Sequence, residues 1–363
     1  MISNQILQNT IDGLKEITKA DMCVFDTEGK ALVFTFRVEN LEQRDIISFA
    51  SSPADSQEIH SYQFFKIYDD DAQLEYILVI DGGSEDSYMI GKIAAFQIQS
   101  LLVAYKERFD KDNFIKNLLL DNLLLVDIFN RAKKLRIGTD VRRSVFLVEA
   151  EGESNAAVLE IMRDHFISVP GDFVTVVDEK NVIVVHEMTG EDPGEENDEI
   201  AKGMLERLEK DGQDKVRISY GTTVEDIKDV SRSYKEAKMA LDVGKIFFEE
   251  RNVVAYSSLG IGRLIYQLPI PLCRMFIQEI FEGKTPEEFD NETLATINKF
   301  FENSLNVSET SRQLYIHRNT LVYRLDKLQK TTGLDLRIFE DAITFKIALL
   351  VVKYMKYVEE EAF

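Results

Sequence analysis

NVSETSRQLYIHRNTLVYRLDKL, residues 306–328, is the most informative stretch of this 363-residue chain. In its first half Val307, Ser311 and Leu314 recur at i, i+4 and i+7, the spacing of a buried helical stripe. Ser311 is small enough for a second helix to come close. Asn306, with a glutamate three positions later, suits an N-cap and capping box. These residues predict a short helix that begins after Asn306.

A second helix is predicted after a short connection from Tyr315 to His317, and Asn319 or Thr320 can begin it. On a helix of about 100° per residue its leucines share one arc and its polar residues the other. The apolar arc holds Leu321, Leu325 and Leu328, and the opposite arc holds Asn319, Thr320, Tyr323, Arg324 and Lys327. An amide can pair with adenine, and a guanidinium suits guanine or phosphate. This face therefore has the chemistry of a recognition helix in a major groove.

The charge distribution suggests that cationic contact with phosphate is concentrated in this segment. The chain has a formal net charge of −21, which argues against a protein that coats nucleic acid with its whole surface. Between Arg312 and Lys330 the balance is +4, so the remainder carries −25. The charged residues of the segment are Arg312, Arg318, Arg324, Lys327 and Lys330 against Asp326. A solvated helix face would give the same local excess, and that alternative stays open at this point.

The segment resembles the C-terminal helix-turn-helix of the sugar-diacid and purine-catabolism regulator family, the CdaR/PucR type. Members carry a similar N-V-S-x-T-A-x-x-L-x-x-H-R-N-T-x-x-Y-R-L run. The matching residues are Asn306, Val307, Ser308, Thr310, Leu314, His317, Arg318, Asn319, Thr320, Tyr323, Arg324 and Leu325. Ser311 replaces the usual alanine, a small-for-small exchange. The following TTGLDLRIFEDAITFKIALLVV also resembles the family's closing segment, so the match covers roughly residues 295–355.

The resemblance implies a transcription regulator that couples a small-molecule signal, such as a sugar diacid or a related metabolite, to expression of a catabolic operon. Ser308 and Thr310 would anchor a phosphate, and Arg324 and Lys327 would contact phosphate or guanine. The remaining expected DNA contacts, which would read bases, are Arg318, Asn319, Thr320 and Tyr323. Because one recognition helix covers a half-site, the partners expected are double-stranded operator DNA and a second copy of the chain.

Residues 138–260 predict a middle domain of β-α-β-β-α-β order. The stretch from Glu187 to Glu199 holds seven acids and no cation, so we expect a solvated loop there. The expected elements are the strand SVFLVEA, a helix at Asn155–Phe166, the hairpin FVTVVDEKNVIVVHE, a helix from about Ile200 to Lys210, the strand VRISYG and a helix at Val230–Val243.

This region resembles the GGDEF-like middle domain of the same regulators, a relative of diguanylate cyclases. A cyclase carries a glycine-glycine-acid signature on the central hairpin, where glycine lets the backbone approach the nucleotide. Here the hairpin reads VVDEKNVIVV, turns near Glu179 to Asn181 and has no glycine pair. We therefore expect no enzymatic activity and no catalytic residue. The rival hypotheses are a diverged nucleotide cyclase-like enzyme and a protein-interaction scaffold in which the helix pair grips a partner helix.

Residues 1–108 predict a small α+β ligand-sensing module of PAS or GAF type, by analogy of fold. We expect a helix at Ile6–Ile17, two strands in MCVFDTEGKALVFTF and two more in FFKIYDDDAQLEYILVI, with an acidic turn at Asp69 to Asp71. The family's diacid-recognition domain has a serine/threonine-aspartate and histidine signature after the first hairpin, where this chain reads ALVFTFRVENLEQRD. The ligand-binding residues are therefore unknown. His60 is the one histidine here, and a structural or exposed role is favoured for it.

The rest of the chain is predicted to be helical. Residues 109–137 predict a connector, and residues 261–363 an all-α domain with the helix-turn-helix at about 306–331. Pro269 and Pro271 should break the first helices of that domain. Before the connector an apolar stripe recurs in 4-3-4 spacing and either pairs two subunits or docks on its own domain. The stripe consists of Ile98, Leu102, Tyr105 and Phe109.

The chain is therefore expected to be a multidomain α+β protein without cofactor or metal. Cys23 and Cys273 lie 250 positions apart, which argues against a disulfide framework or a structural zinc site. The four histidines have no zinc-ligand spacing. No apolar stretch approaches 18 residues without charge, and the first residues do not read as a signal peptide. We expect a cytoplasmic protein with no membrane partner.

Overall fold

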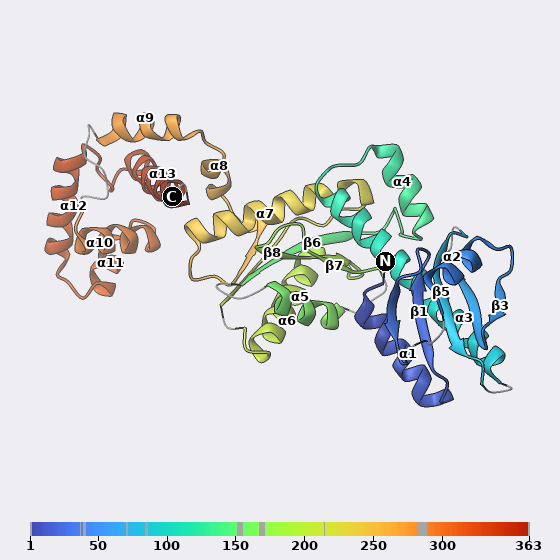
Figure 1. The fold of residues 1–363 in the computed structure, drawn as a ribbon. Coiled ribbons are helices and arrows are strands. Elements are labelled where there is room, and N and C mark those ends of the chain that lie inside the picture. The colour runs from blue at the N-terminus through green and yellow to red at the C-terminus, as the bar shows by residue number, and fades with distance from the viewer. Residues whose placement is uncertain are drawn as a thin grey trace. The chain divides into compact units, whose positions relative to one another are not determined.

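The computed structural model describes residues 2–36, 38, 41–69, 72–83, 86–150, 155–166, 171–213, 215–281 and 289–361. Contacts divide the chain into two units, Met1–Ile115 and Lys116–Phe363 (Figure 1). No helix in these described ranges is long and apolar enough to cross a membrane. Both cysteines, Cys23 and Cys273, are buried free thiols.

The first unit is a five-stranded antiparallel sheet with helices on both faces. The strand order is β2-β1-β5-β4-β3. Helices α1 and α3 share a buried cluster with one face of the sheet, and α2 packs on the other through Ile46 and Phe49. The elements are α1 (Asn4–Thr18), β1 (Met22–Asp26), β2 (Ala31–Phe34), α2 (Gln43–Ser51), β3 (Ser56–Ile59), β4 (Tyr62–Tyr68), β5 (Leu74–Asp81) and α3 (Ser87–Leu119).

The predicted first helix and both predicted strand pairs are confirmed in this unit. Helix α2 and strand β3 were not predicted. The sequence of β3, Ser-Gln-Glu-Ile, has three polar residues in four because it is an edge strand that pairs with β4 alone. No alternation of apolar residues could therefore mark it. Of the predicted acidic turn, Asp70 and Asp71 lie outside the described residues.

The predicted 4-3-4 stripe of α3 docks on its own domain over most of its length. Ile98 and Leu102 are buried in the cluster with the sheet, and Tyr105 packs against it. Gly91 lets the helix approach closely, because a Cβ there would overlap the ring of Phe65. Phe109 is 65% exposed and does not share the cluster. The docking alternative is thus confirmed for the first three residues of the stripe.

The second unit begins with a helix and a five-stranded sheet of order β10-β9-β6-β8-β7. Helices α5 and α6 share a buried cluster on one face of the sheet, and α7 lies on the opposite face (Figure 1). There the Ser219 hydroxyl donates to the carbonyl of Ala237 on α7 at 2.8 Å. The elements are α4 (Leu125–Lys134), β6 (Arg143–Ala150), α5 (Asn155–Phe166), β7 (Phe173–Thr175), β8 (Asn181–Glu187), α6 (Pro193–Lys210), β9 (Val216–Tyr220), η1 (Ile227–Asp229), α7 (Val230–Phe247) and β10 (Val253–Ala255).

The predicted β-α-β-β-α-β order is confirmed by β6, α5, β7, β8, α6 and β9. Strand β10, which pairs in parallel with β9, was not predicted. It has only three residues, Val253–Ala255, so its sequence carries too few positions to show a period.

The acidic stretch from Glu187 to Glu199 was predicted to be a loop, and this was wrong for most of its length. Helix α6 begins at Pro193, and the Asp192 carboxylate caps it by accepting from the N–H of Gly194 at 2.8 Å. Proline suits the first helical position because its missing N–H would lack a partner there. Acidic residues in the first turn are stabilised by the positive end of the helix dipole. The acids therefore mark a helix start and not a solvated loop.

The end of the second unit is all helical around one buried core that includes Phe300, Leu321 and Phe345. The predicted break at Pro269 and Pro271 is confirmed. Pro269 lies between α8 and α9, and Pro271 lies in the first turn of α9. The elements are η2 (Tyr256–Ser258), α8 (Gly262–Tyr266), α9 (Ile270–Phe281), α10 (Asn291–Glu302), α11 (Val307–Gln313), α12 (Arg318–Thr332) and α13 (Phe339–Glu361).

Candidate nucleic-acid interface

The first helix of the predicted pair, α11, begins where the sequence indicates. The Asn306 side chain accepts from the N–H of Glu309 at 3.1 Å and so caps the helix. The reciprocal half of the predicted capping box is not formed. The Glu309 carboxylate instead accepts from Arg312 at 2.7 Å and from Gln313 at 2.8 Å, because both lie within one turn of it.

The second helix, α12, begins slightly earlier than predicted. His317 is its N-cap, and the imidazole Nδ1 accepts from the N–H of Asn319 at 3.2 Å. The helix ends at Gly333, whose φ of 77° is the left-handed conformation that glycine adopts without steric cost. Arg318, Asn319 and the residues after them are therefore held on a regular helix with both ends capped.

The two faces of α12 separate as the sequence predicts. Leu321, Leu325 and Leu328 are 0%, 2% and 3% exposed and belong to the C-terminal core. The stripe of α11 faces the same core, where Val307 and Leu314 pack against the cluster. Burying three leucines contributes about 1.5–3 kcal/mol each, which fixes which side of α12 faces outward.

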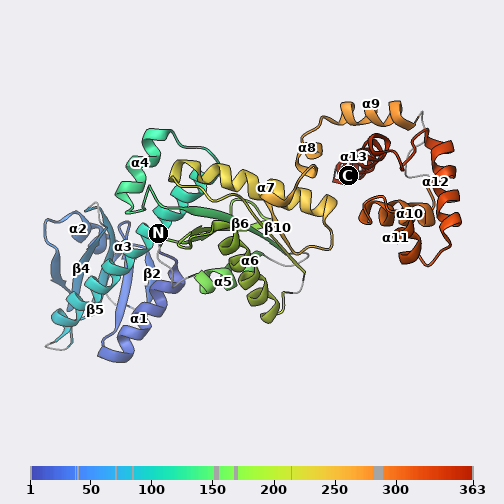
Figure 2. The same ribbon diagram turned by 180° about the vertical axis from the view of Figure 1, so that it is seen from behind.

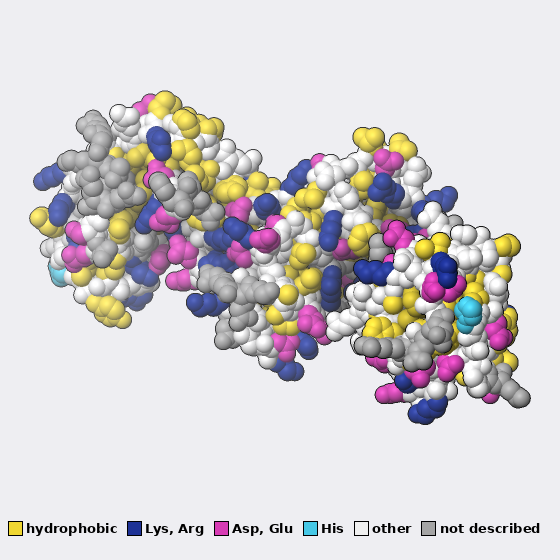
Figure 3. All heavy atoms as spheres, in the orientation of Figure 1, with side chains coloured by type: hydrophobic (Ala, Val, Ile, Leu, Met, Phe, Trp, Pro, Cys, Tyr) yellow, Lys and Arg dark blue, Asp and Glu magenta, His cyan; other side chains and the backbone are white. Residues whose placement is uncertain are grey.

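The outward face of α12 presents hydrogen-bonding groups and cations. Its exposed residues are Arg318, Asn319, Thr320, Tyr323, Lys327 and Lys330, with Tyr323 69% exposed. Figure 3 shows Lys and Arg side chains along the edge of the molecule where Figure 1 places α12.

The cations on this face of α12 are not paired with an acidic side chain of the same helix. Within the described part of the chain, Arg318, Lys327 and Lys330 form no ion pair. The acid of the segment, Asp326, is paired with Arg337 at 2.9 Å. Since the acid is neutralised and the cations are not, the face of α12 carries a net positive charge in an acidic protein.

Arg324 differs from the other predicted contacts because α10 already holds it. Its guanidinium donates to the Thr296 hydroxyl at 3.0 Å and pairs with Glu292, and its side chain is 22% exposed. Asp290, which caps α10 through the N–H of Thr293 at 2.7 Å, has its pKa lowered by that hydrogen bond and by the nearby charge of Lys327. The start of α10 thus places acids beside the cationic face of α12.

The two residues predicted to anchor a phosphate from α11 differ in exposure. Ser308 is exposed in the first turn of the helix. Thr310 is 0% exposed, and its hydroxyl has no hydrogen-bond partner among the described residues. A phosphate cannot reach a fully buried hydroxyl, so the position of Thr310 does not fit the predicted contact. Its place on the inner side of α11, between the stripe residues Val307 and Ser311, is the physical reason.

Sequence reasoning missed Glu292 and Tyr315. Glu292 lies 32 positions from Arg324, and no local pattern links the two. Tyr315 was assigned only to the connection between the helices, yet its side chain is 96% exposed and its backbone has a φ of 55°. A large aromatic residue inside a predicted tight turn is the signal that could have marked it.

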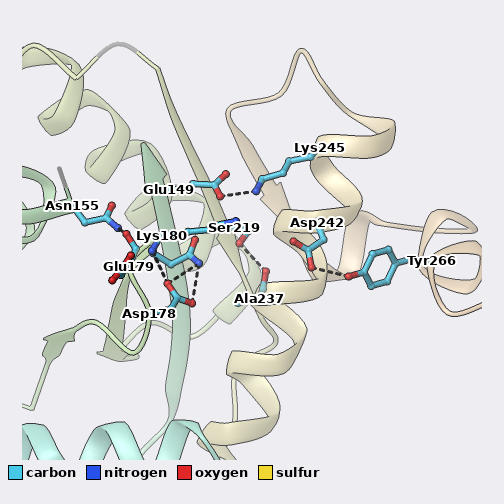
Figure 4. A network of polar contacts seen from close by, with 11 residues as sticks. Glu149, Asn155, Asp178, Glu179, Lys180, Ser219, Ala237, Asp242, Lys245 and Tyr266 are labelled. Carbon is cyan, nitrogen blue, oxygen red and sulfur yellow. Dashed lines mark hydrogen bonds and ion pairs between the residues drawn. The ribbon is translucent and has the colours of Figure 1, made fainter. Parts of the chain in front are cut away.

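The turn of the central hairpin in the middle domain is closed by hydrogen bonds to its own backbone (Figure 4). The Asp178 carboxylate accepts from the backbone N–H groups of Lys180 at 3.0 Å and Asn181 at 2.8 Å, and the Asn155 amide donates to the carbonyl of Glu179. The backbone groups that a glycine-rich hairpin would offer a nucleotide are therefore already satisfied. In the described ranges no group of three or more His, Cys, Asp or Glu side chains could hold a metal ion.

Comparison with known proteins finds two different domains within the second unit. Residues 293–351 match the family described as the PucR C-terminal helix-turn-helix domain, and residues 122–243 match the GGDEF-like domain. The chain is 26% identical over 238 residues to the carbohydrate diacid regulator of Escherichia coli (strain K12), and 26% identical over 140 residues to the purine catabolism regulatory protein of Bacillus subtilis (strain 168). In these two domains the chain is similar to CdaR/PucR-type regulators.

The chain matches these relatives over part of their length. The match to the carbohydrate diacid regulator covers 60% of this chain and 59% of that protein, and the match to the purine catabolism protein covers 38% and 26%. A solved structure, the regulator of polyketide synthase expression from Bifidobacterium adolescentis, is 14% identical and covers 68% of this chain and 92% of that one, with a TM-score of 0.34.

Proposed function

We propose that the chain is a DNA-binding transcription regulator whose α12 enters a major groove. The observation that carries this proposal is the outward face of α12, where exposed cations, an amide and hydroxyls stand together and the acid Asp326 is neutralised by Arg337. A recognition helix needs donors for base edges and cations for phosphates on one face. The match of residues 293–351 to the PucR C-terminal helix-turn-helix domain supports the same function.

The test is fluorescence anisotropy of the full chain on labelled DNA at several salt concentrations. Because phosphate contacts release counterions, the affinity should fall steeply as salt rises. Binding that is absent, or independent of salt, would instead favour a scaffold in which the helix pair grips a partner helix.

Within this proposal the outward residues take different roles. Asn319 would pair with a base, with Arg318, Thr320 and Tyr323 beside it in the groove. Lys327 lies about two turns further along α12, where the helix leaves the groove floor, and would contact phosphate. All of these side chains are exposed, so none has to leave a buried partner to reach DNA.

Of the three remaining predicted contacts, one is kept and two are revised. Ser308 keeps the role of a phosphate anchor through its exposed hydroxyl. Thr310 is left out because it is buried. Arg324 can reach phosphate or guanine only after it releases Glu292 and Thr296.

We propose that the chain acts as a homodimer, and the outer face of α3 supports this. Met89, Ile93 and Phe96 are 66%, 58% and 70% exposed and recur in 4-3 spacing, which suits a second helix. Figure 2 shows α3 in front of the strands of its own unit. Residues 87–104 contain Lys92 as their single charged residue, so two copies of a chain of charge −21 could meet there without bringing acids together.

Sedimentation velocity tests the dimer. Phe96→Glu should shift the full chain toward monomer, because it buries a charge in the paired helices. Phe109→Glu is the matched control, since Phe109 is 65% exposed on the same helix but outside the stripe of Met89, Ile93 and Phe96. If both variants sedimented as the parent chain does, the outer face of α3 would not be the dimer interface.

We propose that the first unit senses a small molecule, such as a sugar diacid or a related metabolite, and passes the signal to the DNA-binding end to control a catabolic operon in the cytoplasm. Its small antiparallel sheet with helices on both faces supports a PAS- or GAF-like sensor. Relatives named for carbohydrate diacids and purine catabolism support that class of effector. A thermal-shift screen of dicarboxylates, purine catabolites and sugars is the test, and a ligand should raise the melting temperature.

We propose that the middle domain is not a cyclase. The satisfied backbone of the hairpin at Asp178 to Asn181 supports this. Incubation of the chain with nucleoside triphosphates and a divalent metal should yield no cyclic product. Detectable product would favour the rival enzyme.

A further inference from the structure

The turn between α11 and α12 contains a strained residue that is not glycine. Tyr315 has a φ of 55°, in the left-handed region that disfavours side chains with a Cβ. The turn requires this conformation, because the N–H of Tyr315 donates to the carbonyl of Arg312 at 3.2 Å and the N–H of Ile316 to that of Ser311 at 3.0 Å. Glycine would adopt the same backbone at lower cost.

Within the described part of the chain, no contact of the Tyr315 side chain offsets this strain. The Tyr315 side chain is 96% exposed, and its ring and hydroxyl have no aromatic or hydrogen-bonding partner there. Burial therefore adds almost nothing to stability at this position. A large aromatic side chain that is fully exposed at a strained position, unlike a small polar one, points to a use outside the fold.

The position of Tyr315 indicates what that use is. It lies three residues before Arg318, the first residue of α12, so its Cα is at most about 11 Å from that of Arg318. It thus stands beside the end of α12 that carries Asn319 and Thr320, where a helix in the groove passes the DNA backbone. Tyrosine hydroxyls are among the groups that bind phosphate oxygens.

We propose that Tyr315 is a further DNA-contact residue, whose hydroxyl donates a hydrogen bond to a backbone phosphate at the edge of the groove. This inference rests on the proposed function of α12. The contact carries no charge, so it fixes the position of the helix and releases no counterion. The strain in the turn is the cost of placing an aromatic residue where glycine would fold more easily.

The experiment uses the full chain with three substitutions. Tyr315→Phe removes only the hydroxyl, and Tyr315→Gly removes the side chain and relieves the strain. Ser304→Gly is the control, because Ser304 also has a positive φ, of 51°, and is exposed in the loop before α11. It relieves the same kind of strain away from the proposed contact.

Melting temperature and DNA affinity separate the outcomes. Both glycine variants should melt about 2–4 °C higher than the parent. Tyr315→Phe and Tyr315→Gly should bind DNA about tenfold more weakly, with an unchanged salt slope, whereas Ser304→Gly should bind as the parent does. Parental affinity in both Tyr315 variants would overturn this inference alone. Failure of the parent chain to bind DNA would overturn the proposed function as well.

Discussion

Freeing Arg324 from α10 should strengthen DNA binding. Its guanidinium is held by the Thr296 hydroxyl at 3.0 Å and by Glu292, which withholds a cation from the groove-facing helix. Glu292→Gln removes the ion pair and one negative charge beside α12. The Glu292 side chain is 71% exposed, so solvent screens the pair and its loss should cost about 0.2–1 kcal/mol of stability. The domain should remain folded.

The gain in affinity follows from the same geometry. Two unit charges about 8 Å apart interact by roughly 0.5 kcal/mol in water, so removing the repulsion between Glu292 and a phosphate gives about a twofold gain. A phosphate contact made by the freed guanidinium adds to it. We expect about a two- to tenfold tighter dissociation constant at ~0.1 M salt, and a smaller gain at higher salt because screening shortens the range of the charges.

Fluorescence anisotropy of the full chain measures this effect, with Glu302→Gln as the matched control. Glu302 lies on the same helix, is exposed and pairs with Lys299, so its substitution changes the net charge equally without touching α12. If Glu292→Gln bound DNA no better than Glu302→Gln, or worse than the parent, the idea that α10 withholds Arg324 would be wrong.

The remaining predictions concern the other domains. A fragment of residues 1–115 should melt cooperatively, because both faces of its sheet are covered within that range, and a featureless melt would contradict this. Calorimetry of the full chain with GTP should show no micromolar binding, because the backbone N–H of Asn181 already donates a hydrogen bond to the Asp178 carboxylate. Burial, and then the charge of Arg207, lower the pKa of His165 below its ordinary 6.5. The unfolded chain therefore binds the proton more readily, so stability should fall as pH drops through about 6.5, and His165→Gln should reduce that slope in melts from pH 7.5 to 5.5.

Periodicity alone located most helices and strands, because their buried faces are built from regular apolar positions. The leucines of α12 show this best, since Leu321, Leu325 and Leu328 are all but inaccessible where a 3.6-residue period places them. The same logic failed for short elements such as β10, which has three residues. It failed also for the start of α6, where acidity was taken as solvation although Asp192 and Pro193 marked a helix cap.

The sequence predicted which side chains of α12 face outward. It did not predict which of them contact other helices. Asn319, Thr320 and Lys327 are exposed because their spacing from the leucines requires it. The pairing of Arg324 with Glu292 depends on how α10 packs against α12, and a pattern within one helix cannot show it. The positive φ of Tyr315 belongs to the turn between α11 and α12, and no pattern of residue types in the sequence shows it.

The most direct test of the central claim compares Asn319→Ala with Lys327→Ala on a site selected by the full chain from random DNA. Anisotropy at several salt concentrations should show that Asn319→Ala costs roughly 1–3 kcal/mol on the selected site and little on random DNA, because it loses a base contact. Lys327→Ala should weaken binding to both DNAs alike and lower the salt slope by about 1, because it loses a phosphate contact. Both side chains are exposed, so neither variant should melt below the parent by more than a surface substitution does. If both variants bound the selected site as tightly as the parent, α12 would not be the helix that reads DNA.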